Sequence, residues 1–325
     1  MKREDFQALA ANIDTLTPHQ RKLLAKQLSK VDSAQEVSAL IESRVTDAPV
    51  CPKCAHTQIA RWGSASGLQR YRCLGCKATF NALTGTPLAR LRKKGKWLDY
   101  AQQMEQGISV RKSAAACEVH RNTAFRWRHR FLTLPNGSKP ARLAGIAEAD
   151  EAFFLESFKG EKKAMQRPPR KRGSKASKRG LSDEQIPVLI CRDRSGSTTD
   201  FILEKDDRTH IYAALKPVVA SDAILCTDGS RAMIGVARKM GLTHRPVNLA
   251  AGIRVVAGVY HVQNVNAYGS RLKTWMRRFN GVATRHLANY LGWRRYLDRA
   301  NRSTSPVAFL SAALGIKSIQ QLTMT

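Results

Sequence analysis

YHVQNVNAYGSRLKTWMRRF, residues 260–279, divides into a buried face and a polar face when it is wound as a helix. One side gathers the apolar residues Val265, Tyr268, Leu272, Trp275, Met276 and Phe279. A narrow stripe on another side holds the polar residues Asn266, Ser270, Lys273 and Arg277. Asn266 and Lys273 lie two turns apart on one line. A surface helix with a solvated basic stripe also explains this pattern, so the remaining sequence decides whether the stripe is reactive.

The composition points to a polyanionic partner. The chain has 325 residues, with 55 Lys and Arg against 25 Asp and Glu, which gives a net charge of +30. Nucleic acid is the expected partner of so basic a protein. The hydrophobic content of 43% excludes global disorder, and no run of about 18 apolar residues predicts a membrane span. The beginning MKREDFQALA predicts no secretory signal, so we expect a cytoplasmic bacterial protein held at the nucleoid by DNA, with no membrane partner.

Four of the seven cysteines form two CxxC pairs separated by eighteen residues. This spacing predicts a zinc ribbon in which Cys51, Cys54, Cys73 and Cys76 hold one structural Zn²⁺. Four unlinked buried cysteines are the alternative. The small core of the ribbon is expected to come from the aromatic residues Trp62, Tyr71 and Phe80.

Residues 108–131 predict two short helices joined by a turn. This is a helix-turn-helix arrangement, whose second helix enters the major groove of DNA. Phe125, Trp127 and Phe131 on the second helix are expected to be buried against the first. The outward-facing residues expected to contact DNA are Arg121, Asn122, Arg126 and Arg130. Any hairpin of two alanine-bearing helices gives a similar pattern, so the prediction depends on the basic context.

After the turn sequence of residues 135–140, short apolar runs alternate with helical patterns and predict an α/β domain with a mixed sheet. Strands are expected at 146–155, 185–191, 199–203 and 223–226, and helices at 210–219 and 232–240. Between the first two strands, residues 159–180 hold ten Lys and Arg. A solvated loop and a segment that becomes ordered on a phosphate backbone both fit this insertion.

Two acids lie at the edges of the predicted strands. Asp150 belongs to the first strand, and Asp228 follows an apolar run and precedes Gly229 and a helix. Open sheets bind ligands at such strand ends, although a single Asp there is more often a helix cap or a turn residue. The pair, taken with Asn266 and Lys273, is the sharper signal.

Three segments resemble the core of insertion-sequence transposases of the DDE superfamily, which have an RNase H-like fold. They are AEADEAFF around Asp150, CTDGSRAM around Asp228, and residues 260–298. The segment YRCLGCKATFNALTGTPLARL resembles the zinc ribbon and following segment found ahead of that core. More narrowly, the chain resembles the zinc-ribbon group in which Asn takes the third position, giving an Asp, Asp, Asn, Lys set. The resemblance covers about residues 48–300.

The resemblance implies a catalytic set in which Asp150, Asp228 and Asn266 hold Mg²⁺ or Mn²⁺, two ions in all, and Lys273 contacts DNA near the scissile phosphate. Two divalent ions suit phosphodiester cleavage because they acidify the nucleophile, stabilise the leaving oxygen and hold an in-line geometry. Asn266 departs from the commoner Glu and carries no charge, which leaves an inactive copy as an alternative. Glu151 is a nearby acid, but strand alternation points it away from Asp150.

We therefore expect a transposase that binds terminal inverted repeats and cuts and joins double-stranded DNA as a homo-multimer. The alternative is a DNA-binding regulator that keeps the zinc and helix-turn-helix modules but does not cut. His261 and Arg277 are further residues expected to contact DNA, and a structural role for His261 fits equally.

Five regions are expected along the chain. They are an N-terminal helical segment at 1–48, a zinc ribbon at 49–90, a helix-turn-helix module at 91–134, an RNase H-like catalytic domain at 141–300 with its basic insertion at 159–180, and a C-terminal helix and tail at 301–325. Within the first segment we expect two or three short helices, one capped at Thr17 and another at Ser33.

Overall fold

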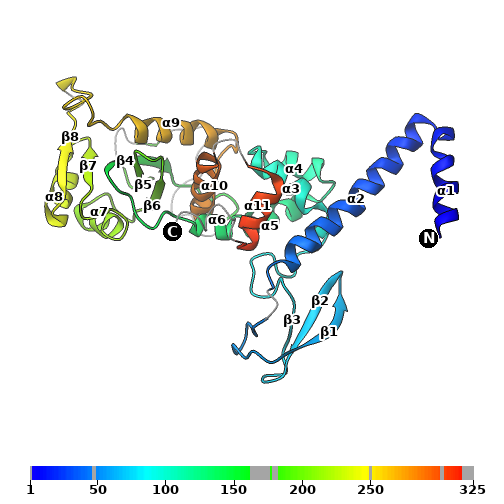
Figure 1. Cartoon of the computed structure of the whole chain (residues 1–325). Helices are drawn as coiled ribbons and strands as arrows, with labels where there is room; N and C mark the ends of the chain where they lie inside the picture. Colours follow the sequence, from blue (N-terminus) through cyan, green and yellow to red (C-terminus); the bar gives the residue numbers. More distant parts are fainter. Residues whose placement is uncertain are drawn as a thin grey trace. The chain divides into compact units, whose positions relative to one another are not determined.

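The computed structural model describes residues 2–45, 49–161, 176–177, 182–248, 251–300 and 304–316. Figure 1 shows the elements in chain order. They divide into two compact units, one made of Met1–Phe131 with Ser305–Thr325 and the other of Leu132–Thr304. Most of the basic insertion lies outside the described residues.

The first unit begins with two helices and a short 3-10 turn: α1 (Arg3–Ala11), η1 (Ile13–Thr15) and α2 (Pro18–Glu42). The predicted cap at Thr17 is confirmed, because its side chain accepts from the backbone N–H of Gln20 and the Gln20 side chain accepts in return. The second helix start predicted at Ser33 is wrong. Residues 18–42 contain no Gly or Pro after Pro18, so nothing ends the first helix before the second pattern begins.

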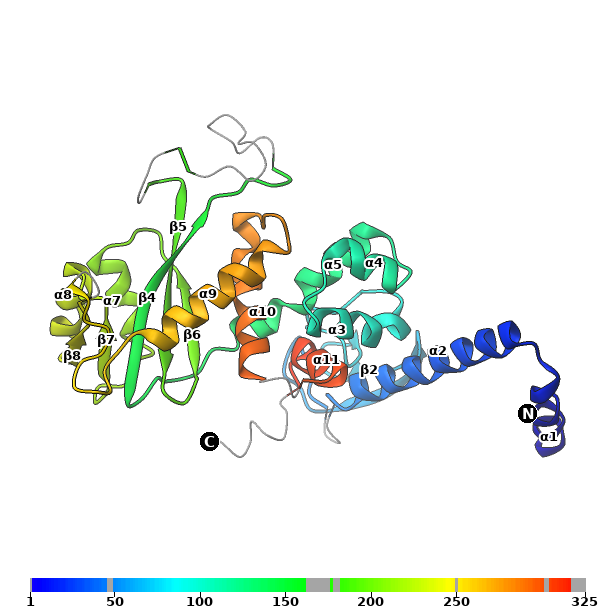
Figure 2. The ribbon, with the colours of Figure 1, turned by 90° about the horizontal axis from the view of Figure 1, so that it is seen from above.

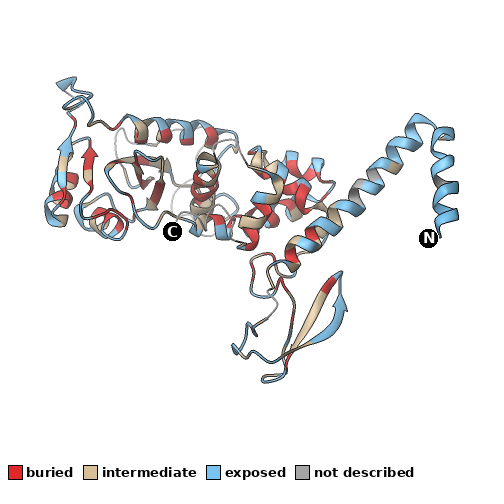
Figure 3. Ribbon diagram, viewed as in Figure 1, coloured by how far each residue is buried: buried red, intermediate tan, exposed pale blue. Residues whose placement is uncertain are grey.

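Among the side chains of α2 that the structure describes, the buried ones lie near its C-terminal end. Val37 and Ile41 are fully buried, whereas Leu28 and Val31 are more than half exposed. Figure 3 shows this change from an exposed to a buried surface along the helix.

A three-stranded antiparallel sheet follows, in the order β1-β2-β3. Its strands are β1 (Ile59–Ala65), β2 (Leu68–Cys73) and β3 (Thr79–Phe80). The rings of Tyr71 and Phe80 stack with centroids 5.5 Å apart, as expected of the ribbon core. Trp62 is not part of that core. It lies on the edge strand, is 46% exposed, and has the guanidinium of Arg72 4.5 Å above its ring.

Three helices follow the small sheet in this unit. They are α3 (Trp97–Glu105), which follows the short turn η2 (Lys94–Lys96), α4 (Val110–Ala116) and α5 (Arg121–Phe131). Trp127 and Phe131 are buried as predicted and meet the ring of Tyr100 edge to face. The burial predicted for Phe125 is wrong, since its side chain is 41% exposed. Two residues along a helix are about 200° apart, so Phe125 and Trp127 do not share one face.

The C-terminal helix α11 (Pro306–Leu314) belongs to this same unit and packs on α3. Both Figure 1 and Figure 2 show the two helices side by side. Phe309, Leu310 and Leu314 are fully buried there. The core of the three-helix module is therefore completed by a segment that follows the second unit in the chain.

The second unit is built on a five-stranded mixed sheet in the order β6-β5-β4-β7-β8. Its strands are β4 (Ile146–Leu155), β5 (Gln185–Asp193), β6 (Thr198–Ile202), β7 (Ile224–Thr227) and β8 (Thr243–Pro246). β4 is antiparallel to β5 and parallel to β7. This confirms the predicted α/β fold with a mixed sheet. The prediction missed β8, whose sequence THRP has no apolar residue apart from its final proline.

Helices cover both faces of this sheet. α7 (Arg208–Leu215) and α8 (Arg231–Met240) pack on one face, where they form a core with Ala147 and Ala149 of β4. α9 (Gln263–Arg277) lies on the other face, and α10 (Leu287–Arg299) packs against it through aromatic rings such as Trp275 and Trp293, whose centroids are 5.0 Å apart. The short elements α6 (Thr133–Gly137) and η5 (Thr284–His286) complete the unit.

The apolar face predicted for residues 260–279 is confirmed. Val265, Tyr268, Leu272 and Trp275 are buried, while Lys273 is exposed and Asn266 is half-buried. None of the described helices combines the length and the apolar composition that crossing a bilayer requires.

Candidate functional site

Sheet register brings Asp150 and Asp228 together. β4 and β7 run parallel, and their last paired residues are Glu148 and Cys226. Asp150 and Asp228 each lie two residues beyond that pair, so the same register places them side by side at the end of β7. In-register residues of parallel strands project to the same face of the sheet, which here is the face covered by α9. Asp228 also accepts a hydrogen bond from the backbone N–H of Ser230 at 3.0 Å, so it is a turn residue as well.

The polar stripe of α9 faces this acid pair. Asn266, Gly269, Ser270 and Lys273 follow one another at helical spacing and line a hollow of about 130 Å³ together with Asp150. Since a water molecule occupies about 30 Å³, the hollow has room for an ion and a few waters. The structure thus brings three of the four predicted catalytic residues to one hollow, and Asp228 is the neighbour of the first of them.

Electrostatics agrees with this proximity. Burial raises the pKa of the Asp150 carboxyl, a backbone N–H lowers it, the nearby Asp228 carboxylate raises it, and the Lys273 ammonium lowers it. Two carboxylates that share a partly buried space repel each other, so the pair is suited to a cation.

Strand alternation directs the Glu151 side chain away from that of Asp150, yet Glu151 is also among the residues that line the hollow. Burial comes first among the causes that raise its pKa to about 8, followed by the carboxylates of Asp206, Asp150 and Asp228. Asp206 follows β6 in the chain, and its own pKa is raised by burial and by Asp228. Four carboxyl groups therefore influence one another around this strand end.

Glu148 was not singled out in the sequence, yet it joins the strand to the helix. Its side chain is fully buried on the same face as Asp150, and Oε2 accepts a hydrogen bond from the backbone N–H of Val265 at 2.9 Å. Val265 is in the first turn of α9, whose N-cap residue Val262 makes no side-chain cap. Strand alternation puts Glu148 and Asp150 on the same face of β4, and this is the sequence feature that could have identified Glu148.

Two basic side chains lie close to the Glu148 carboxylate. Arg194 Nη1 lies 3.0 Å and His261 Nδ1 3.4 Å from Oε1 of Glu148. Arg194 also reaches His261 Nε2 at 2.7 Å. His261 therefore contacts Glu148 and Arg194 just before α9 and is not among the residues that line the hollow. Arg277 is exposed in the last turn of the helix.

The four cysteines meet at one point. The Sγ atoms of Cys51, Cys54, Cys73 and Cys76 lie within 4.8 Å of one another. Two of the separations are 3.7 Å and 3.6 Å, close to the edge of about 3.8 Å of a tetrahedron with Zn–S bonds of about 2.3 Å. A donor set of four thiols at this spacing fits a structural zinc ion.

The predicted DNA-contacting residues of α5 do not all have the same surroundings. Arg121, Asn122 and Arg126 are exposed. Arg130 is also exposed, but its guanidinium donates hydrogen bonds to the carbonyls of Pro87 and Ala89. Arg128 is fully buried and donates to the carbonyl of Ile108 at 2.6 Å, a structural role that the sequence did not indicate.

Comparisons with known proteins agree with this architecture. A family model for the ISXO2-like transposase domain matches residues 142–296, and one for a Homeodomain-like domain matches residues 88–136. A protein of Halobacterium salinarum described as an uncharacterized protein in transposable element ISH50 is 28% identical over 268 residues, which cover 80% of this chain and 89% of that protein.

The solved structures that resemble this chain include that of a pre-cleavage Mos1 transpososome. It is 11% identical, covers 67% of this chain and 74% of the other, and has a TM-score of 0.26. The ISXO2-like transposase domain, the homeodomain-like module ahead of it and the halobacterial relative together support an insertion-sequence transposase of the DDE superfamily.

Proposed function

We propose that this chain binds the terminal inverted repeats of its element, cuts the DNA at the element ends, and joins the resulting 3'-hydroxyls to target DNA. The observation that carries the proposal is the convergence of Asp150, Asp228, Asn266 and Lys273 from three separate segments. Because two ends must be cut and joined together, we propose that it works as a homo-multimer on the DNA.

Each of the four side chains has a distinct part in this proposal. The carboxylates of Asp150 and Asp228 and the amide oxygen of Asn266 would hold Mg²⁺ or Mn²⁺, which prefer oxygen ligands. When bound, such ions acidify the attacking hydroxyl and neutralise charge on the leaving oxygen. Lys273 is exposed at the rim of the hollow, where its ammonium would bind a backbone phosphate and hold the strand over the acids.

DNA recognition would fall to the first unit. Arg121 and Asn122 are exposed at the N-terminal end of α5, and Arg126 follows one turn later on the exposed side. The first residues of a recognition helix are the ones that reach base edges in the major groove. The net charge of +30 supplies the non-specific attraction to the duplex.

A strand-joining assay tests the proposal. The full chain is incubated with a labelled duplex carrying the element end, with unlabelled target DNA, and with Mg²⁺ or Mn²⁺. Labelled strands joined to the target, and only with the metal, are the expected result. Salt-sensitive binding without cleavage or joining would instead favour the regulator that does not cut.

Zinc removal gives a separate prediction for the ribbon. Cys54→Ser is expected to release the zinc and unfold the ribbon, since a fold this small depends on its metal. Specific binding of the end duplex should fall at least about tenfold, while the melting transition of the second unit stays unchanged. Zinc content, end binding and thermal unfolding are the measurements.

Cys54→His is the matched control, because imidazole is also a zinc ligand and Cys54 is the exposed cysteine of the four. It should keep most of the zinc and of the binding. Unchanged end binding in a zinc-free Cys54→Ser protein would contradict a role of the ribbon in recognition.

A further inference from the structure

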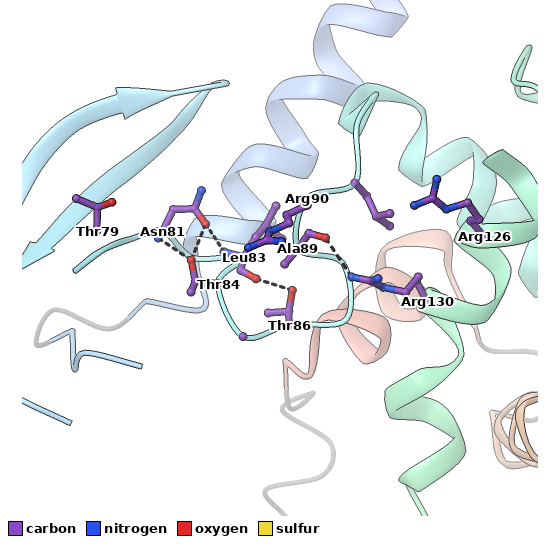
Figure 4. Close-up of a pocket in the computed structure, with 11 residues that line it drawn as sticks. Thr79, Asn81, Leu83, Thr84, Thr86, Ala89, Arg90, Arg126 and Arg130 are labelled. Atoms are coloured by element: carbon purple, nitrogen blue, oxygen red, sulfur yellow. Dashed lines mark hydrogen bonds between the residues drawn. The ribbon is translucent and has the colours of Figure 1, made fainter. Parts of the chain in front are cut away.

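The segment between the ribbon and η2 forms a pocket with α5. The pocket has a volume of about 890 Å³ and lies within the first unit (Figure 4). Its polar lining comes from Thr79, Asn81, Thr84, Thr86, Arg90, Arg126 and Arg130. Of these residues, the sequence analysis predicted DNA contact only for Arg126 and Arg130 of α5.

Arg130 holds this segment in place. Its guanidinium donates to the carbonyl of Pro87 and, through Nη2, to that of Ala89 at 3.1 Å. Within the segment, Thr86 donates to the carbonyl of Leu83 at 2.8 Å. Figure 4 shows the bond from Arg130 to Ala89, which joins the loop to α5, and the bond from Thr86 to Leu83 within the loop. The loop is therefore preformed on the helix, and Arg130 is a positioning residue for it.

Arg90 and Arg126 are the free cations of the pocket. Both are exposed, and neither side chain has a hydrogen bond or ion pair with any residue that the structure describes. No acidic residue lines the pocket. Arg90 also has a left-handed backbone, with φ of +62°, which is uncommon for a residue other than glycine. Two unpaired guanidinium groups facing one hollow without a carboxylate make an anion site.

We propose that this pocket receives the backbone phosphates of the duplex whose major groove takes α5. The inference rests on the proposed DNA binding and extends it to the loop of residues 81–91. Arg126 lies one turn after Asn122 on the exposed side of the same helix, so DNA on that helix continues onto the pocket. Contacts to phosphate fix the position of a protein on DNA and carry no sequence information. Arg90 and Arg126 thus set the register in which Asn122 meets the bases.

The test is the salt dependence of duplex binding by the full chain. Arg90→Gln and Arg126→Gln are each measured on an end duplex and on an unrelated duplex between about 50 and 200 mM salt. Each variant should lower the slope of log K against log salt by about 0.9. At fixed low salt both duplexes should be bound on the order of tenfold more weakly, the value of one charge-assisted hydrogen bond. Arg21→Gln on α2 removes the same charge from an exposed site of the same unit and should behave as wild type.

The outcomes separate this inference from the proposed function. Equal weakening on both duplexes with the smaller slope supports the phosphate pocket. Wild-type slopes in both variants overturn it, and in that case an Asn122→Ala protein that loses its preference for the end duplex would leave the proposed function intact. Weakening on the end duplex alone would make the pocket a base-reading site and also overturn the inference. A wild-type protein that binds neither duplex would remove the proposed function itself.

Discussion

Asp228→Ala is expected to lower the rate of strand cleavage and joining by at least about a thousandfold while leaving end binding intact. The loss follows from the site: Asp228 and Asp150 are the two acids brought together by the parallel register of β7 and β4. Metal-ion catalysis contributes several kcal/mol to such reactions, and each 1.36 kcal/mol is a factor of ten in rate. Product formation on a labelled end duplex under single-turnover conditions is the measurement.

The same strand offers a matched control. Asp222 precedes β7, whereas Asp228 follows it, and both side chains are exposed. Asp222→Ala removes an identical charge at the wrong end of the strand and should retain the wild-type rate. Equal rates for wild type and Asp228→Ala would show that cleavage, if present, takes place elsewhere.

Glu148→Ala is expected to lower both stability and activity. The substitution leaves the buried N–H of Val265 without its acceptor, at a cost of about 1–3 kcal/mol, and removes the carboxylate from Arg194 and His261. Arg194 is 30% exposed and regains part of its hydration, so we expect a total of about 2–4 kcal/mol. For a unit of this size the melting temperature should fall by about 5–15 °C.

The effect on activity should exceed what unfolding explains. Asn266 follows Val265 directly, so the start of α9 that Glu148 holds also carries the amide into the hollow. A displacement of about 1 Å in such a group can cost on the order of a hundredfold in rate. Glu148→Gln keeps an acceptor for the N–H and should recover most of the melting temperature.

Glu204→Ala is the control for Glu148→Ala. The Glu204 carboxylate lies 3.8 Å from Nε2 of His210. The side chain of Glu204 is 84% exposed, and removal of such a pair costs about 0–1 kcal/mol. If Glu148→Ala cleaves at the wild-type rate at a temperature where it is fully folded, Glu148 does not position α9 for the reaction.

Periodicity predicted the elements that carry the site. The strand expected at 146–155 has the observed bounds of β4, and the apolar face expected in residues 260–279 is the buried face of α9. Both patterns are local, because burial on one side imposes a period on neighbouring residues. The resemblance to DDE transposases then indicated which polar residues on these elements form one catalytic set.

What sequence reasoning missed depends on contacts between distant segments. Glu148 looks like any acid in a half-exposed strand until α9 is docked over it. Arg130 was expected to face DNA, and its bonds to residues 87 and 89 follow from the path of a loop without a periodic pattern. The return of α11 to the first unit has no local signal either, since an apolar helix packs on any apolar surface.

The central claim is that residues 150, 228 and 266 surround one divalent-metal site. Fe²⁺ in place of Mg²⁺, with ascorbate and oxygen, generates hydroxyl radicals that cut the polypeptide close to the bound ion, and the fragments can be mapped by mass spectrometry. We predict cuts near all three positions in the wild-type chain and the loss of all three in Asp150→Ala. Cuts at only one of the positions, or cuts that persist unchanged in Asp150→Ala, would contradict the claim.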